Sequence, residues 1–193
     1  MSDYAEVWAA ARPYMRARKN DVHIPLSFGY AQRLVEQHPE ADADVVLLAI
    51  LLHDVGWAMV DQEAIYRDGF GPGMFESDVR IAHEKEGARL AQAILTLLGY
   101  STGLVEEVVA IIDGHDTRRR ALSRNDELVK DADRLWRFSV TGVSVACDWF
   151  AKTPREYVEH LVPQLEQFFT PAAASMAGTE LEHTRLALRV ADL

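Results

Sequence analysis

The spacing of apolar residues restricts the fold of this chain more than any other feature of its sequence. Apolar side chains recur at the 3.6-residue period of an α-helix along almost the whole length, as Ala88, Ala91, Leu95 and Leu98 do within the stretch 79–98. No convincing strand-like alternation interrupts this pattern. Further helices are expected at 43–54, 102–114, 124–138, 140–151 and 154–169. The sequence therefore predicts an all-α protein.

Glycine and proline mark the breaks between these helices. Pro25 is expected in the first turn of the second helix, which ends before Pro39. Residues 61–75 are rich in glycine and are expected as a mobile loop, and 172–175 as a short linker into a final helix. We interpret residues 1–193 as one domain, with a core at about 20–150 and a helical C-terminal extension at about 151–193.

The composition excludes several classes of function. The chain has 30 acidic against 20 basic residues and a formal charge of -10, whereas proteins that bind nucleic-acid polymers normally carry a basic surplus. Its longest apolar run, Val45–Leu52, is far shorter than the roughly 20 residues that span a bilayer. The single Cys147 excludes a disulfide framework and a cysteine-built zinc site. We expect a cytoplasmic protein that binds neither nucleic-acid polymers nor membranes.

The apolar run ends abruptly in His53 and Asp54, two groups that are costly to bury. Burial is tolerated when such groups are paired or bind a metal ion, and a His-Asp pair at a helix end can also be a cap beside a satisfied core histidine. His23, His83 and His115 flank the pair at nearly equal intervals, each near the end of an expected helix. Helical hairpins of that length bring such positions to one level of a bundle, where metal sites are built.

The order His23, His53-Asp54 and Asp133 resembles that of the HD-domain superfamily of metal-dependent phosphohydrolases. The local strings that agree with the superfamily are HIPLSFGYAQRLV at His23, LLAILLHDVG at the pair, HEKEGARLAQAILTLLG at His83 and DADRL at Asp133. The similarity covers about residues 20–150 and implies an HD-type helical bundle. It also implies that His23, His53, Asp54 and Asp133 are the metal ligands.

The resemblance leaves two questions about histidines open. His38 is a rival for the first ligand, although its place beside Pro39 suits a helix cap better. His83 and His115 would either contact the phosphate of a substrate or hold a second ion, as equivalent histidines do in many members. We favour the phosphate contact. A solvated His83 at the start of its helix is the simplest alternative.

The implied ligands suit Mn, Fe, Co, Ni or Zn, and Mg at lower affinity. Such an ion lowers the pKa of a bound water toward ~7 and neutralises phosphoryl charge, which is what phosphoester hydrolysis needs. The candidates for catalytic roles beside the ion are Asp54, His83, His115 and Asp116.

One position departs from a nucleotidase subgroup of the superfamily. That subgroup has a glutamate three residues after the aspartate of the pair, where this chain has Trp57. The general acid or base therefore cannot be carried over, and Asp54, Asp116 and, more weakly, Glu84 are the candidates. Three tryptophans on apolar helical faces are expected in the core: Trp57, Trp136 and Trp149.

Charged residues near the implied ligands have competing interpretations. Asp131 lies about 200° around a helix from Asp133, so we expect it behind the ligands or paired with Arg134. The basic clusters 16–19 and 118–120 could each bind a phosphate, arginine by a bidentate fork, or could be solvated helix ends.

The sequence favours a metal-dependent phosphohydrolase that acts on a small phosphorylated metabolite, a nucleotide in particular. One alternative is a dinuclear-iron oxygenase of the inositol-oxygenase-like branch, which uses the same residue types around two irons. Another is a non-catalytic module that senses a nucleotide, although such modules usually lose ligands. The sequence leaves the oligomeric state open, a homodimer included.

Overall fold

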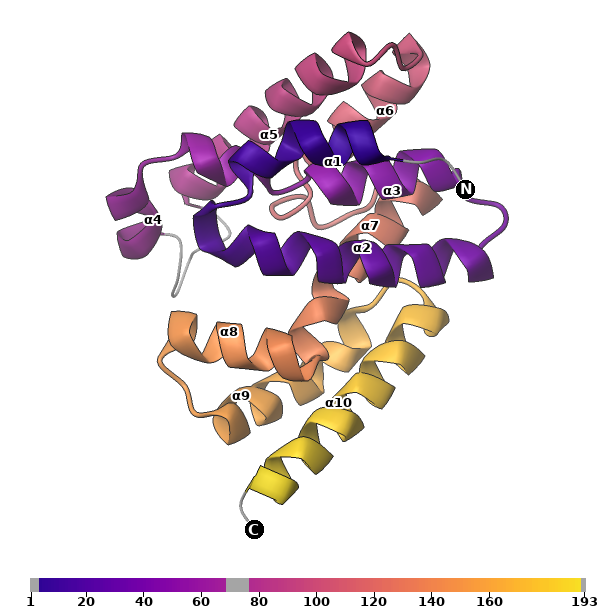
Figure 1. The fold of residues 1–193 in the computed structure, drawn as a ribbon. Helices are drawn as coiled ribbons and strands as arrows, with labels where there is room; N and C mark the ends of the chain where they lie inside the picture. Colours follow the sequence, from indigo (N-terminus) through magenta and orange to yellow (C-terminus); the bar gives the residue numbers. More distant parts are fainter. Residues whose placement is uncertain (1–3, 69–76, 192–193) are drawn as a thin grey trace.

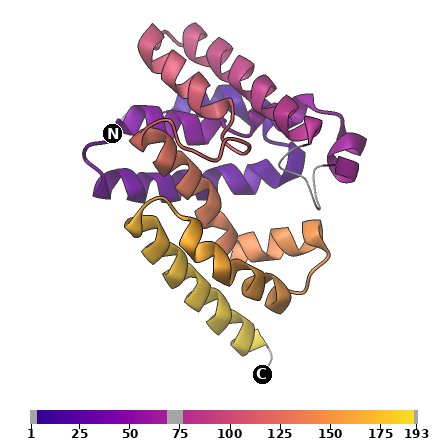
Figure 2. The same ribbon diagram turned by 180° about the vertical axis from the view of Figure 1, so that it is seen from behind.

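The computed structural model describes residues 4–68 and 77–191, which are built from helices (Figure 1 and Figure 2). No β-strand occurs within these two ranges, so the predicted all-α fold is confirmed. The α-helices are α1 (Ala5–Ala11), α2 (Asn20–Gln37), α3 (Ala43–Leu52), α4 (Gln62–Asp68), α5 (Asp78–Leu97), α6 (Thr102–Ile112), α7 (Arg124–Leu135), α8 (Val140–Phe150), α9 (Pro154–Leu161) and α10 (Pro171–Ala191). Short 3-10 helices are η1 (Arg12–Tyr14), η2 (Ala17–Lys19), η3 (Val55–Met59), η5 (Trp136–Phe138) and η6 (Val162–Gln167).

Helix α3 lies at the centre of the fold and carries the longest apolar run. Every side chain from Val45 to Leu52 is buried, and the helix packs against α2, α6 and α7. The carboxylate of Asp42 caps its first turn by accepting hydrogen bonds from the backbone N–H groups of Asp44 and Val45. Burial contributes roughly 1.5–3 kcal/mol for each large aliphatic side chain. The end of α3, where His53 follows, is thereby fixed in the interior.

Helices α8, α9 and α10 form a second group, below α2 and α7 in Figure 1. Helix α10 contacts α2, α7, α8 and α9. Tyr157, Leu161 and Met176 from this group belong to the same apolar core as α3. The C-terminal residues are thus packed onto the bundle as helices. Over the two described ranges, no helix combines the length and the apolar character that crossing a bilayer requires.

The start of α2 differs from the expected one. Arg18 and Lys19 have positive φ angles of 50° and 59°, which turn the chain immediately before the helix. Helix α2 therefore begins at Asn20, and Pro25 lies in its second turn and not in its first. The expectation for Pro25 was wrong because the left-handed turn at two basic residues has no glycine or proline to mark it.

Two expected irregular segments contain helix. Residues 62–68 of the expected loop form α4, whereas 69–75 lie outside the described residues. The expected linker at 172–175 is wrong, because these residues form the first turn of α10. Alanine is the best helix former, so the segment has the propensity for helix once its start is fixed.

Asp131 fixes the start of α10. Its carboxylate accepts hydrogen bonds from the backbone N–H of Phe169 (2.8 Å) and from the N–H (2.9 Å) and Oγ1 (2.8 Å) of Thr170. The expected ion pair between Asp131 and Arg134 is not what holds Asp131. Arg134 Nη1 instead donates a hydrogen bond to the carbonyl of Gln167. Asp131 therefore anchors α10 to α7.

Replacing Asp131 by alanine is expected to lower the free energy of unfolding by about 3 kcal/mol, because three donors, two of them buried, lose their acceptor. Urea unfolding followed by circular dichroism measures the change. Asp148→Ala, at an exposed aspartate of α8, is the matched control and is expected to leave the midpoint in place. Equal midpoints for the two variants would contradict the anchoring role.

Candidate metal centre

Three histidines are oriented by hydrogen bonds from their outer ring nitrogens. His53 follows the last residue of α3, and its Nδ1 donates to the carbonyl of Ile50 at 2.7 Å. His115 repeats this arrangement after α6, with Nδ1 donating to the carbonyl of Ile112 at 2.9 Å. Nδ1 of His23 shares a 3.2 Å hydrogen bond with the hydroxyl of Ser27, one turn further along α2. Metal-binding histidines are typically held in this way, which leaves Nε2 for the ion.

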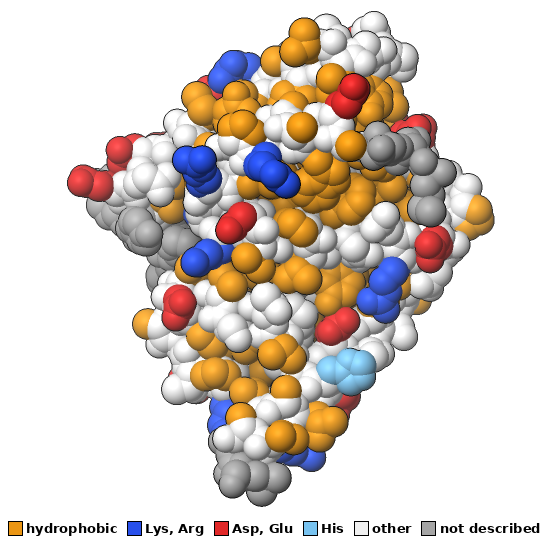
Figure 3. Space-filling view, viewed as in Figure 1, with side chains coloured by type: hydrophobic (Ala, Val, Ile, Leu, Met, Phe, Trp, Pro, Cys, Tyr) orange, Lys and Arg blue, Asp and Glu red, His pale blue; other side chains and the backbone are white. Residues whose placement is uncertain are grey.

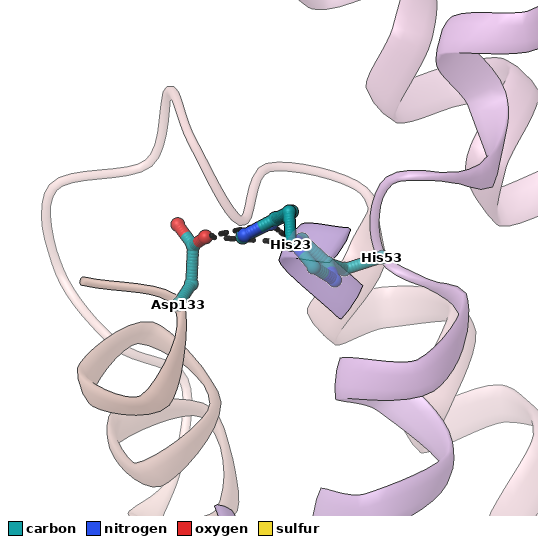
Figure 4. Close-up of side chains that lie close together, drawn as sticks. All are labelled: His23, His53 and Asp133. Atoms are coloured by element: carbon teal, nitrogen blue, oxygen red, sulfur yellow. Dashed lines mark hydrogen bonds and ion pairs between the residues drawn. The ribbon is translucent and has the colours of Figure 1, made fainter. Parts of the chain in front are cut away.

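The first group of ligands comes from α2, α3 and α7. Figure 4 shows His23, His53 and Asp133 pointing toward one another. The Nε2 atoms of the two histidines are 2.9 Å apart, and Asp133 Oδ1 lies 3.2 Å from His23 and 3.5 Å from His53. Asp54 Oδ2 completes the group, 3.4 Å from His23 Nε2. Ligand atoms about 2.0–2.2 Å from a divalent ion lie at such mutual distances, so these residues fit one.

A second group faces the other oxygen of Asp54. Nε2 of His83, on α5, and Nε2 of His115 are 3.4 Å apart, and each lies within 3.5 Å of Asp54 Oδ1. Asp116 Oδ2 lies 3.7 Å from His83 Nε2. Nδ1 of His83 is buried and has no hydrogen-bond partner among the described residues, unlike the other three histidines. Asp54 therefore lies between two groups of side chains. In the second group, no hydrogen bond from the described residues fixes the outer ring nitrogen of His83.

The electrostatics of the centre keep its carboxylates ionised. Burial by itself would raise the pKa of Asp54, but the charge of His53 and hydrogen bonds from His115 and His83 outweigh it and hold the pKa well below its usual range. Burial likewise opposes ionisation of Asp133, whose pKa is nevertheless lowered by the hydrogen bonds of His23 and His53. Two ionised carboxylates among buried imidazoles favour a cation at this place.

A close approach of two backbones brings His83 to the centre. Gly56, in the turn after Asp54, faces Gly87 on α5. A Cβ at Gly56 would lie 2.0 Å from the carbonyl oxygen of His83 and 2.4 Å from the backbone nitrogen of Gly87. Only glycine permits this contact between η3 and α5.

Trp57 is a site residue whose role sequence reasoning missed. It is buried, as expected, but its indole Nε1 donates to Asp54 Oδ1 at 2.9 Å. Its ring also stacks on His83, with centroids 3.8 Å apart and planes 10° from parallel. Trp57 therefore orients both Asp54 and His83. The signal was its position three residues after Asp54, where the nucleotidase subgroup has glutamate.

Asp116 and Glu84 have different surroundings. Asp116 pairs with the buried Arg80, and this charge outweighs burial and lowers the pKa of Asp116. Glu84 uses both oxygens to hold the loop, accepting from the backbone N–H groups of Asp116 and Thr117 (2.8 Å each) and from the Thr117 hydroxyl (2.7 Å). Lys130 Nζ holds the same loop through the carbonyl of His115 at 2.6 Å. Glu84 thus supports the site and is a poor candidate for acid or base.

A cavity of about 400 Å³ opens beside the centre. A narrower space, lined by His23, Asp54 and Asp133, shares several lining residues with it. Guanidinium groups of Arg18, Arg80 and Arg137 line both spaces.

Of the two basic clusters in the sequence, 16–19 and 118–120, only the first contributes a side chain to the lining of the cavity. Arg18 lies with its guanidinium carbon 4.1 Å from the ring centroid of Trp57, and burial lowers its pKa to about 10. Arg118 instead donates to the carbonyls of Ala110 and Asp113 and to Asp126, which closes the end of α6. Residues 118–120 do not line the cavity, so the phosphate-binding alternative for that cluster is not supported. Sequence reasoning missed Arg80 and Arg137, although their spacing of three and four residues from His83 and Asp133 places them on the same helical faces.

His38 is excluded as a ligand, and the other candidate ligands lie together in the structure. His38 ends α2 and pairs with Glu40 at 2.9 Å, remote from the ligand groups, so it is not the first ligand. His23, His53 and Asp133 are brought together, as are His83, His115 and Asp116. Asp54 belongs to both arrangements through its two oxygens.

Comparison with known proteins agrees with this geometry. The pattern of the HD domain family matches residues 23–137, which is more than half of the chain. A crystal structure of a predicted HD superfamily hydrolase from an uncultured Thermotogales bacterium resembles this one with a TM-score of 0.65 and 20% sequence identity, over 96% of this chain and 88% of that chain. At that identity the likeness shows the fold alone. Comparison with curated proteins gives no match. The chain belongs to the HD domain family, whose members are generally metal-dependent phosphohydrolases.

Proposed function

We propose that this protein hydrolyses the phosphoester of a small phosphorylated metabolite, a nucleotide, with a divalent ion held by His23, His53, Asp54 and Asp133. The observation that carries the proposal is the convergence of these four side chains beside a cavity lined by guanidinium groups. The ion, when bound, supplies an activated water and a Lewis acid for the phosphoryl oxygen.

The cations of the cavity are suited to binding the phosphate. Arg18, Arg80 and Arg137 line it although the chain as a whole carries a charge of -10. Cations inside a pocket raise the local concentration of anions more effectively than the same charges spread over a surface. On the face in Figure 3, by contrast, Lys and Arg side chains are scattered among apolar and acidic ones. This distribution supports a small anionic substrate.

Asp116 is the better placed of the two carboxylates considered as proton acceptors. Asp54 already accepts from Trp57 and faces histidines with both oxygens. Asp116 lines the main cavity, which Asp54 does not. We assign the general base to Asp116, with Arg80 holding it in place.

The phosphohydrolase proposal is tested by a hydrolysis screen. The protein is stripped with a chelator, reloaded separately with Mn, Co, Ni or Mg, and incubated with nucleoside monophosphates and sugar phosphates while released phosphate is measured. Phosphate release that depends on added metal is expected for at least one nucleotide. Protein that binds the metal but releases no phosphate from any compound would overturn the proposal.

The roles of His83 and His115 are decided by metal stoichiometry. If they contact phosphate, replacing either by alanine should leave one tightly held ion and raise the KM about tenfold or more, because a charge-assisted hydrogen bond contributes roughly 1.5–3 kcal/mol. Elemental analysis and steady-state kinetics measure the two effects, with the exposed His183→Ala as control. A stoichiometry of two that falls to one in both variants would instead assign a second ion between them. Iron as that metal would favour the oxygenase alternative.

A further inference from the structure

The far wall of the cavity is built by residues outside the part of the chain that matches the HD family. The match ends at residue 137. Helix α8, helix α9 and η6 follow it, and side chains from each of them line the cavity. Their lining side chains include Trp149, Phe150, Tyr157, His160, Gln164 and Gln167. This wall is largely aromatic next to the centre and polar further along the chain.

Aromatic faces dominate the part of the wall nearest the ligands. Trp149 lines both the main cavity and the narrow space beside Asp54, and it contacts Trp136 edge to face with centroids 5.7 Å apart. Phe150 and Tyr157 stack nearly parallel, with centroids 5.9 Å apart. The guanidinium of Arg18 lies 5.1 Å from the Trp149 ring, so cation and ring surfaces adjoin. A ligand bound here would contact the guanidinium of Arg18 and, next to it, the flat apolar ring of Trp149.

Trp136 supplies an independent sign of a missing partner. Its side chain is 2% exposed and lines both spaces, between His23 and Trp149. Its indole Nε1 has no hydrogen-bond partner among the described residues. A buried indole N–H normally finds an acceptor, and an unpaired one is costly. Nε1 itself is not exposed to the cavity, so an acceptor on a ligand there would reach it only after a movement of the ring.

We propose that this wall binds a planar heterocyclic base, with Trp149 as the residue that determines specificity for it. The inference rests on the proposed phosphohydrolase function and names its substrate class, a nucleoside monophosphate. A cavity of about 400 Å³ is within the range of small-molecule sites and exceeds what a phosphate group alone would fill. Any nucleotide base can stack on an aromatic side chain, because every base has a π-face.

The test uses two phosphoesters that differ by the base, adenosine 5′-monophosphate and ribose 5-phosphate. Trp149→Ala is expected to lower kcat/KM for the nucleotide about tenfold or more beyond any loss that it causes for the sugar phosphate, which also depends on Arg18 beside the Trp149 ring. Trp149→Phe, which keeps an aromatic face, should restore most of the nucleotide activity. Trp8→Ala is the matched control, because Trp8 packs on Phe28 away from the cavity and should alter neither substrate.

Binding gives a second readout that does not depend on turnover. In ¹H–¹⁵N spectra of the magnesium-loaded protein, adenosine 5′-monophosphate should shift the indole N–H signals of Trp136 and Trp149 and leave that of Trp8 in place. Calorimetry should show weaker nucleotide binding in Trp149→Ala. If the nucleotide binds in this way but is not hydrolysed, the phosphohydrolase proposal fails while the base-binding wall stands.

Three results would overturn the base-binding wall. One is an equal loss of activity on both phosphoesters in Trp149→Ala, which would assign Trp149 to structure or to the phosphate. Another is unchanged nucleotide activity in that variant. The third is equal affinity of the parent protein for the nucleotide and for ribose 5-phosphate.

Discussion

Replacing Asp54 by asparagine is expected to abolish metal binding at micromolar metal and, with it, phosphate release. Asp54 presents Oδ2 to His23 and His53 and Oδ1 to His83 and His115, so its single negative charge faces both ligand groups. The amide keeps the size of the side chain but removes that charge and turns a donor toward one pair of imidazoles. A buried cation then loses a charged ligand that cannot be replaced by water without repacking.

The measurement is elemental analysis after dialysis against micromolar metal, with circular dichroism to show that the variant is folded. Asp148→Asn makes the same chemical change at an exposed residue and should keep full occupancy. A folded Asp54→Asn protein that retains the ion would show that the ligand assignment is wrong.

Replacing Gly56 by alanine is expected to lower the free energy of unfolding by about 3 kcal/mol or more, because the added methyl group overlaps backbone atoms that cannot rotate away. The atoms in question are the carbonyl oxygen of His83 and the amide nitrogen of Gly87. Helix α5 would have to move outward from η3 and carry His83 away from Asp54. We therefore expect weaker stacking on Trp57 and a loss of whatever His83 binds.

Urea unfolding and near-ultraviolet circular dichroism, which reports the packing of the aromatic side chains including Trp57, measure these effects. Gly29→Ala is the matched control: it lies within α2, and a Cβ there would meet nothing within 4 Å. Alanine at such a helical position should be neutral or raise stability by up to about 1 kcal/mol. Similar destabilisation by the two substitutions would contradict the close-approach argument.

Local patterns in the sequence were sufficient to predict an all-α fold, and together with the family resemblance they indicated the side chains that the structure brings together. The run from Val45 to Leu52 can only be buried, so the two polar residues that follow it had to be compensated. The spacing of His23, His83 and His115 around this pair, together with the resemblance to the HD family, predicted a metal site. The structure brings all of them together around Asp54.

What the sequence did not predict depends on contacts between elements far apart in the chain. Asp131 was expected behind the ligands or paired with Arg134, yet its carboxylate binds Thr170 at the start of α10. Trp57 was expected as core because nothing local shows that its indole N–H reaches Asp54. Arg80 on α5 meets Asp116 in the loop after α6, a pairing that helical periodicity does not encode.

Helix α7 connects the two halves of the molecule mechanically. Asp133 and Asp131 lie about half a turn apart on this helix. Asp133 faces the histidines, and Asp131, on the opposite side, accepts hydrogen bonds at the start of α10. A rigid helix cannot displace one of these carboxylates without displacing the other. We therefore expect order in the C-terminal helices and affinity at the metal centre to be linked, and by reciprocity the coupling free energy would be the same in both directions.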